Sequence, residues 1–146
     1  MVSMRQYGAM RVRGLGMLVL STVLMLAAPP ARPAGGQRCG GRLPTIVGTV
    51  GQDRIRGTTQ ADVIVGLAGR DIIRGRGGRD RICGNRGRDD LRGGERRDRL
   101  AGNRGNDTLA GGPGRNHLKG GLGKRDYCVV NDDRASGCEL VDVPGD

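Results

Sequence analysis

Seven aspartates recur at intervals of nine residues and are the side chains in this sequence best suited to chemistry. They are Asp53, Asp62, Asp71, Asp80, Asp89, Asp98 and Asp107, and Asn116 stands one further interval along the chain. Carboxylate and amide oxygens are hard ligands that suit Ca²⁺, whereas zinc and copper prefer sulfur and nitrogen, and Mg²⁺ demands a stricter octahedron. The pattern therefore predicts a row of calcium sites, provided that the fold brings successive aspartates together.

A nine-residue repeat surrounds these aspartates and must supply the elements that position them. Nine units run without insertion or deletion from Gly48 to Cys128. Each unit starts with Gly, seven have Gly at position four, and eight have Ile or Leu at position eight, with Tyr127 in the ninth. We interpret a unit as a six-residue turn, in which glycines at positions one and four permit positive φ, followed by a three-residue strand. Position eight then faces inward, and positions seven and nine face outward.

Two such units form one coil of the predicted fold, and stacked coils would place parallel strands ~4.8 Å apart. Asp53 then lies one strand spacing from Asp71, and every later pair 18 residues apart repeats this arrangement. Carboxylates held so close repel each other unless a cation lies between them. We therefore predict an all-β fold, a parallel β-roll (β-solenoid) of nine nonapeptide repeats with a core one Ile or Leu wide. The composition agrees, because 29 Gly, 1% aromatic residues and no Phe or Trp exclude a broad aromatic core.

The units resemble the nonapeptide G-G-x-G-x-D-x-U-x of the hemolysin-type, or repeats-in-toxin (RTX), calcium-binding family. The resemblance covers residues 48–128. It implies a secreted bacterial β-roll in which Ca²⁺ lies between turns, held by the position-six side chains and by carbonyls of the glycine-rich turns. The turn glycines that it implies are Gly48, Gly66, Gly69, Gly75, Gly78, Gly84, Gly87, Gly102 and Gly105. Such rolls often accompany a toxin, protease or lipase domain, and here we expect a roll without one.

The repeat departs from the family pattern at three positions. Position two is Gly in three units alone, so several turns are expected to be strained. In the ninth unit, Arg125 replaces the aspartate and Asp126 is one residue out of phase. Position five is Arg in five units, and a guanidinium could satisfy the neighbouring carboxylate without metal. A metal-free roll held by Asp–Arg pairs is therefore an alternative, and its arginines would be Arg70, Arg79, Arg88, Arg97 and Arg115.

The basic charge supports a second alternative. The chain has a net charge of +10, and six arginines occupy outward positions of the predicted strands: Arg54, Arg56, Arg74, Arg81, Arg92 and Arg99. They could bind an anionic polymer such as cell-wall material, polysaccharide or nucleic acid, although single-stranded nucleic acid usually needs stacking aromatics. We expect no enzymatic activity, because the single histidine, His117, lies at an outward position without a nucleophile partner.

The first 36 residues are typical of a signal peptide. Arg5, Arg11 and Arg13 precede an apolar stretch from 15 to 28, which is followed by small residues at 34–36. This stretch is shorter than the ~20 residues that span a bilayer. We therefore predict an extracellular bacterial protein with no membrane span in the mature chain. Its segments would be an N-terminal cap and degenerate repeat at 37–47, with Ile46 facing inward, the calcium-binding roll at 48–128 and a C-terminal cap at 129–146.

Four cysteines remain after the predicted signal peptide. In an exported chain of this size they indicate two disulfides, for which three connectivities exist. Cys128 and Cys138 bracket a polar segment, so their bridge would close a loop over the last coil. Cys83 faces outward, and Cys39 in the opening unit is its more favourable partner. A bridge from Cys83 to Cys128 is less favourable because the two units fall on opposite sides of the coil.

Overall fold

A computed structural model describes residues 37–131 and 133–142, and every regular element in this part of the chain is a β-strand. The predicted signal peptide at 1–36 lies outside the described residues. Within the described ranges, no helix is long and apolar enough to span a membrane. The strands are β1 (Ile46–Val47), β2 (Arg54–Arg56), β3 (Val63–Ala68), β4 (Ile72–Arg76), β5 (Arg81–Arg86), β6 (Asp90–Gly94), β7 (Arg99–Arg104), β8 (Thr108–Ala110), β9 (His117–Leu122), β10 (Tyr127–Val129), β11 (Arg134–Ser136) and β12 (Leu140–Asp142).

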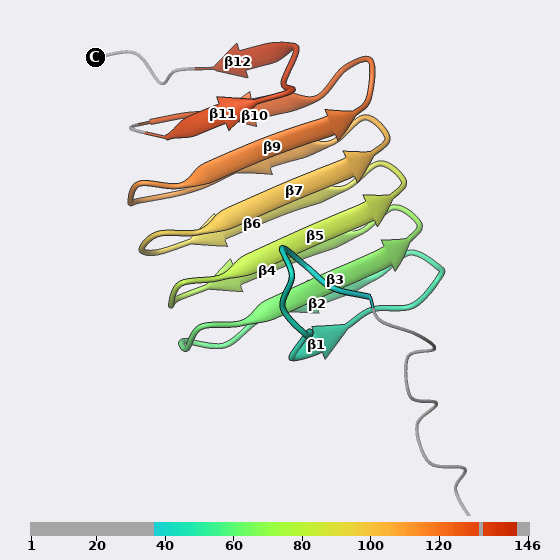
Figure 1. Cartoon of the computed structure of the whole chain (residues 1–146), viewed down its shortest axis with the longest axis vertical. Helices are drawn as coiled ribbons and strands as arrows, with labels where there is room; N and C mark the ends of the chain where they lie inside the picture. Colours follow the sequence, from blue (N-terminus) through green and yellow to red (C-terminus); the bar gives the residue numbers. More distant parts are fainter. Residues whose placement is uncertain (1–36, 132, 143–146) are drawn as a thin grey trace, which may run out of the picture. The chain divides into compact units, whose positions relative to one another are not determined.

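The strands alternate between two parallel sheets. The odd-numbered strands form one six-stranded sheet in the order β1-β3-β5-β7-β9-β11, and the even-numbered strands form the other (Figure 1). Paired residues are 18 apart over most of the stack, as in Ile64 opposite Ile82 and Ile73 opposite Leu91. This confirms the predicted β-solenoid, in which two units build one coil and units of the same parity stack.

The core is a single file of aliphatic side chains between the two sheets. The inward residues of the regular coils are 0–2% exposed: Ile64, Ile73, Ile82, Leu91, Leu100, Leu109 and Leu118. Ile46 and Ile55 are half-buried in the first coil and pack against this file, which confirms the expected inward position of Ile46. Because burying one such side chain contributes about 1.5–3 kcal/mol, the file supplies most of the hydrophobic stabilisation available to this chain.

The regular repeat ends before residue 128, so the count of nine equal units is not confirmed. Cys128, not Tyr127, lies opposite Leu109 and is fully buried in the inward file. The cause is one extra residue in the preceding turn, which moves the buried carboxylate from the place of Arg125 to Asp126. Beyond this point β11 and β12 add one more strand to each sheet, so the stack continues into the segment that was expected to cap it.

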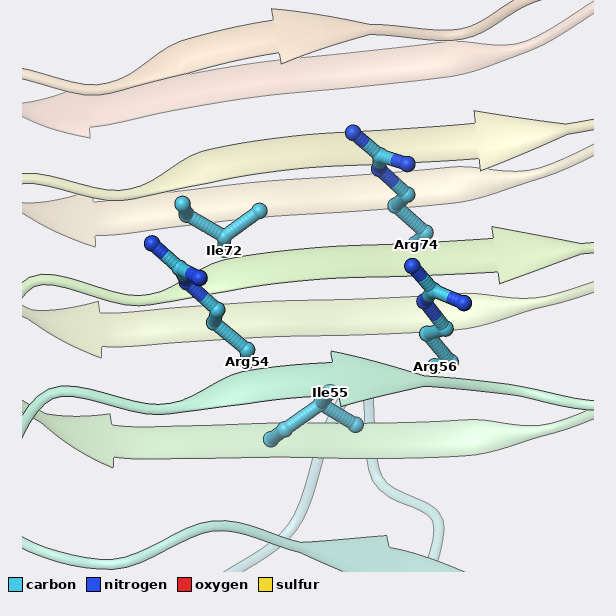
Figure 2. A pocket seen from close by; sticks show the side chains of 5 residues that line it. All are labelled: Arg54, Ile55, Arg56, Ile72 and Arg74. Atoms are coloured by element: carbon cyan, nitrogen blue, oxygen red, sulfur yellow. The ribbon is translucent and has the colours of Figure 1, made fainter.

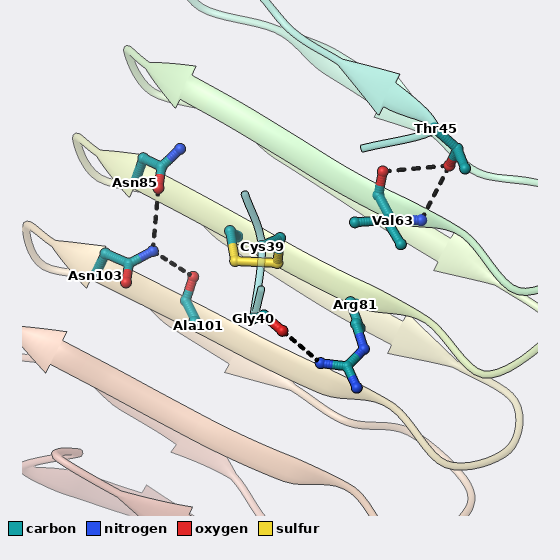
Figure 3. Close-up of a disulfide and its surroundings, with 9 residues drawn as sticks. Cys39, Gly40, Thr45, Val63, Arg81, Asn85, Ala101 and Asn103 are labelled. Atoms are coloured by element: carbon teal, nitrogen blue, oxygen red, sulfur yellow. Dashed lines mark hydrogen bonds between the residues drawn. A yellow bond between two sulfur atoms is a disulfide. The ribbon is translucent and has the colours of Figure 1, made fainter. Parts of the chain in front are cut away.

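Both predicted disulfides are present. Cys39 is bonded to Cys83 and Cys128 to Cys138. The first bridge fixes the N-terminal segment on the outer face of β5, where the carbonyl oxygen of Gly40 accepts a hydrogen bond from Arg81 Nη1 at 3.2 Å (Figure 3). Nearby, the Thr45 hydroxyl accepts a hydrogen bond from the Val63 N–H at 3.0 Å. The N-terminal segment is thereby attached to two strands of the odd-numbered sheet.

Candidate metal centre

From Asp71 onward, each position-six aspartate uses one carboxylate oxygen to hold the backbone of the preceding coil. Oδ1 of Asp71 accepts a hydrogen bond from the N–H of Asp53 at 2.9 Å, and Oδ1 of Asp80 accepts one from the N–H of Asp62 at 2.8 Å. The same bond recurs through the stack and builds two ladders. One contains Asp53, Asp71, Asp89, Asp107 and Asp126, and the other contains Asp62, Asp80, Asp98, Asn116 and Asp133. The predicted pairing of aspartates 18 residues apart is therefore present.

The second carboxylate oxygen has a different environment. Within the described residues, Oδ2 is buried and has no hydrogen-bond partner in seven aspartates: Asp71, Asp80, Asp89, Asp98, Asp107, Asp126 and Asp133. A buried carboxylate oxygen without a donor is costly, because it has lost its water and gained nothing in return. A regular series of such oxygens is the arrangement that a bound cation would compensate.

Glycine at position one makes room for this oxygen. A Cβ on Gly48 would lie 2.7 Å from Asp53 Oδ2 and 2.6 Å from the carbonyl oxygen of Gly66 in the next coil. Position one therefore needs glycine for space, and the expectation that it needs positive φ is wrong. Positive φ occurs instead at positions two and four, for example at Leu67 (φ 85°) and Gly69 (φ 117°). The backbone strain expected where position two is not glycine is therefore present, because residues such as Leu67 adopt the left-handed conformation.

Asn116 shows what the second oxygen of an aspartate faces. Its Oδ1 accepts the N–H of Asp98 at 2.8 Å, as in the other rungs, so its Nδ2 occupies the place of Oδ2. Nδ2 donates to the carbonyl oxygens of Gly112 at 2.9 Å and Gly114 at 3.4 Å, at positions two and four of the same turn. Because the units repeat, we infer that an aspartate at position six directs its Oδ2 towards the carbonyl oxygens at positions two and four of its own turn. Three oxygens without a proton between them are a donor set that would suit a cation.

Side chains alone do not complete such a site. Among the described residues, no group of three or more His, Cys, Asp or Glu side chains could hold a metal ion. The ligand set must therefore combine carboxylate oxygens with backbone carbonyls, which is a donor set suited to Ca²⁺ and unsuited to zinc. The residues present fit a calcium ion on this ground.

The electrostatics of the ladders agree with a need for positive charge. Burial raises the pKa of Asp71 and Asp80, and the neighbouring carboxylate in the same ladder raises it further against the backbone hydrogen bond. Burial likewise raises the pKa of Asp89 to about 6, of Asp98 to about 7 and of Asp107 to about 6. Ionised carboxylates are thus unfavourable in the central coils, and either a proton or a cation relieves them.

The first coil satisfies its carboxylates without a cation. Oδ2 of Asp53 accepts hydrogen bonds from the N–H of Thr49 at 2.6 Å and from its hydroxyl at 3.1 Å. Oδ2 of Asp62 accepts the same pair from Thr58, at 2.7 and 2.9 Å. Both threonines stand at position two, and neither has positive φ. The nine-residue spacing makes all seven aspartates equivalent, so it does not distinguish those of the first coil.

The alternative of Asp–Arg pairs is wrong for the residues that the structure describes. The ion pair in this part of the chain joins Arg92 to Asp90 at 3.2 Å, and neither residue belongs to a ladder. The position-six carboxylates face inward. The position-five arginines are exposed, and they are Arg70, Arg79, Arg88, Arg97 and Arg115. Adjacent positions point to opposite sides, so a guanidinium at position five does not reach the carboxylate beside it in sequence.

Two ladder residues, Asp126 and Asp133, are not among the ligands expected from the sequence. Oδ1 of Asp126 accepts the N–H of Asp107 at 2.9 Å across 19 residues, and Oδ1 of Asp133 accepts the N–H of Asn116 at 2.8 Å across 17. For Asp126 the signal is an aspartate after a glycine-rich turn with one residue added, whereas residues 127–132 before Asp133 contain no glycine and give no such signal. His117, by contrast, is exposed on β9 as expected.

Comparison with known proteins agrees with this geometry. The family model for the RTX calcium-binding nonapeptide repeat (4 copies) matches residues 56–91 and 92–124. No curated protein and no solved structure is significantly similar to the chain. The matched residues include strands β3 to β9 and five of the aspartates whose Oδ2 has no partner.

Proposed function

Since residues 56–124 of this chain belong to the RTX calcium-binding nonapeptide repeat family, we propose that the protein is a secreted calcium-binding β-roll whose ions lie between adjacent coils. The observation that carries the proposal is the series of buried Oδ2 atoms without a partner. The ions would be held by Asp71, Asp80, Asp89, Asp98 and Asp107, together with carbonyl oxygens at positions two and four of the turns. Bound Ca²⁺ would supply the positive charge that compensates these buried carboxylate oxygens.

Calcium binding would be coupled to folding. The ligands come together only when the coils stack, because each ladder joins residues 17–19 apart in sequence. An ion that binds the folded chain alone adds its binding free energy to the stability of the fold. The chain would therefore stay loose where calcium is scarce and close where calcium is abundant. The two disulfides support an oxidising, extracellular environment for this step.

The test is circular dichroism of the full chain, with its disulfides intact, first in chelator and then with added Ca²⁺ or Mg²⁺. We expect a β-sheet signal that grows with Ca²⁺ and not with Mg²⁺. A signal already complete in chelator and unchanged by Ca²⁺ would contradict the coupling of calcium to folding. Titration calorimetry in the same samples measures ion binding separately from the change in structure.

A matched pair of variants locates the ions. Asp98→Ala removes a buried ladder carboxylate, and Asp90→Ala removes a half-buried carboxylate outside the ladders at equal cost in charge. We expect Asp98→Ala to bind fewer calcium ions and to need more Ca²⁺ for folding, while Asp90→Ala behaves as the unmodified chain. Equal effects of the two variants would mean that calcium responds to net charge and not to the ladders.

A further inference from the structure

The outer side of the odd-numbered sheet carries two parallel columns of basic residues. In the strand column, Arg81 on β5 lies opposite Arg99 on β7, Arg99 opposite His117 on β9, and His117 opposite Arg134 on β11. The turn column stands at position five of the turns that lead into β5, β7 and β9. We call these seven residues the arginine grid: Arg79, Arg81, Arg97, Arg99, Arg115, His117 and Arg134.

In the part of the chain that the structure describes, the acid that lines the hollow of the grid is the buried Asp98. Like charges directly opposite each other on neighbouring strands repel, and burial together with Arg99 and Arg42 lowers the pKa of Arg81. Among the described residues, no grid arginine forms an ion pair, whereas Arg92 on the other sheet is paired with Asp90. Such a concentration of guanidinium groups is electrostatically unfavourable by itself. An anionic partner would relieve the repulsion between them.

Part of the grid also lines a hollow on the protein surface. The hollow, of about 770 Å³, is lined by five grid residues, Arg97, Arg99, Arg115, His117 and Arg134, together with Asp98 and Asn116. The paired strands that carry the residues of the strand column are one strand spacing apart, ~4.8 Å. One sugar unit of an extended polysaccharide has a similar length. A planar guanidinium pairs with a sulfate or carboxylate through two parallel hydrogen bonds.

We propose that the arginine grid binds a linear anionic polysaccharide that lies along the stack of coils and places successive sulfate or carboxylate groups on successive arginines. A nucleic acid fits this face less well. The described residues contain one aromatic side chain, Tyr127, which lies on β10 in the other sheet and offers no stacking platform here. The described part of this face is a six-stranded sheet, and the major groove of duplex DNA admits a helix or a two-stranded ribbon.

The opposite sheet provides the control surface. Arg56 on β2 and Arg74 on β4 are also in register and project outward together with Arg54 (Figure 2). Their hollow is smaller, about 280 Å³, and Ile55 and Ile72 form part of its wall. The column ends at the next strand, where Arg92 is paired with Asp90. Arg70 and Arg88 stand in the turns before β4 and β6, so this face differs from the grid in its interrupted strand column and its smaller hollow.

The experiment measures binding of the full chain to heparin, a linear sulfated polysaccharide, in Ca²⁺ and at low salt. Arg97→Gln/Arg115→Gln removes two grid charges, and Arg56→Gln/Arg74→Gln removes two charges from the control face. We expect the grid variant to bind heparin about tenfold more weakly and with a shallower salt dependence, and the control variant to bind almost as the unmodified chain. Dextran sulfate should bind and neutral dextran should not.

Three results would overturn the proposal. Equal loss in the two variants would mean attraction by net charge, and absence of heparin binding at low salt would remove the partner. Tighter binding of duplex DNA than of heparin would assign the face to nucleic acid instead.

Circular dichroism of each variant in Ca²⁺ excludes a loss of fold, and Arg99→Gln/Arg134→Gln repeats the test on the strand column. The proposal does not rest on calcium binding, which calorimetry follows independently.

Discussion

The first coil and the coils that follow it use the same aspartate in two different ways. In the first coil, Thr49 and Thr58 donate an N–H and a hydroxyl to the second carboxylate oxygen. In the following coils that oxygen is buried and has no donor within the described residues. The difference teaches that the position-two residue decides whether an aspartate turn is complete by itself or needs a cation.

The backbone explains why the two regions differ. Position two has positive φ at Leu67, Arg76 and Asn85, but not at the two threonines. With positive φ, the position-two N–H no longer donates to Oδ2, and no hydroxyl replaces it. We therefore expect the first coil to be the metal-independent part of the roll and the central coils to be the part that responds to calcium.

The largest expected effect comes from the core that both regions share. Leu100→Ala removes a side chain that is 2% exposed in the central file, whereas Ile55→Ala removes one that is half-buried in the first coil. Because a large-to-small change in a buried site leaves a cavity, Leu100→Ala should lower the free energy of unfolding by about 3 kcal/mol. Ile55→Ala should cost clearly less. Urea unfolding in saturating Ca²⁺ measures both, and equal losses would mean that the first coil is packed as tightly as the centre.

Asparagine substitutions distinguish the aspartates of the central coils from those of the first coil most directly. Asn116 satisfies its own turn, since its Nδ2 donates to two carbonyl oxygens. Asp89→Asn should therefore stabilise the roll in chelator and weaken its response to Ca²⁺, by roughly 1–3 kcal/mol in each direction. Asp62→Asn should bring no gain in chelator, because its amide would meet the donors of Thr58. Urea unfolding with and without Ca²⁺ distinguishes them, and a loss of stability in chelator for Asp89→Asn would break the comparison.

The nine-residue spacing was sufficient to predict most of the fold. It predicts the coil of 18 residues, the parallel register and the buried file, because the pleat and the spacing leave no other inward position. It could not predict the roles of the two carboxylate oxygens, which depend on the φ of a neighbouring residue. It also missed Asp126, Asp133 and the inward Cys128, because a fixed period does not register a turn that gains or loses a residue.

The pH dependence of the metal-free chain tests the central coils as a group. Burial raises the pKa of Asp89 and Asp107 to about 6 and that of Asp98 to about 7, so the folded state binds protons more tightly than the unfolded state. The stability that this contributes is complete below the unfolded pKa near 4 and is lost as the pH rises through 6 to 7. In chelator, the urea midpoint should therefore rise when the pH falls from 8 to 5.5.

Calcium should remove much of this pH dependence, because an ion at the ladder takes the place of the proton. The urea midpoint in saturating Ca²⁺ should then change little between pH 8 and pH 6. A midpoint in chelator that falls on acidification would contradict the raised pKa values. It would also remove the electrostatic contrast between the central coils and the first coil.

The smallest expected effect tests the first coil alone. Thr58→Val keeps the shape of the side chain and the N–H bond to Asp62, but it removes the hydroxyl that donates to Oδ2 at 2.9 Å. The loss should be about 1 kcal/mol, equal in chelator and in Ca²⁺, because the part-buried bond to Asp62 disappears and no ion site is affected. The exposed N–H of Gln60, which donates to the hydroxyl at 3.1 Å, can bond to water instead. Thr59→Val is the matched control, since Thr59 is exposed in the same turn. If Thr58→Val instead made the chain depend more strongly on Ca²⁺, the hydroxyl would be a substitute for the ion, and the first coil would be a calcium site that threonine keeps closed.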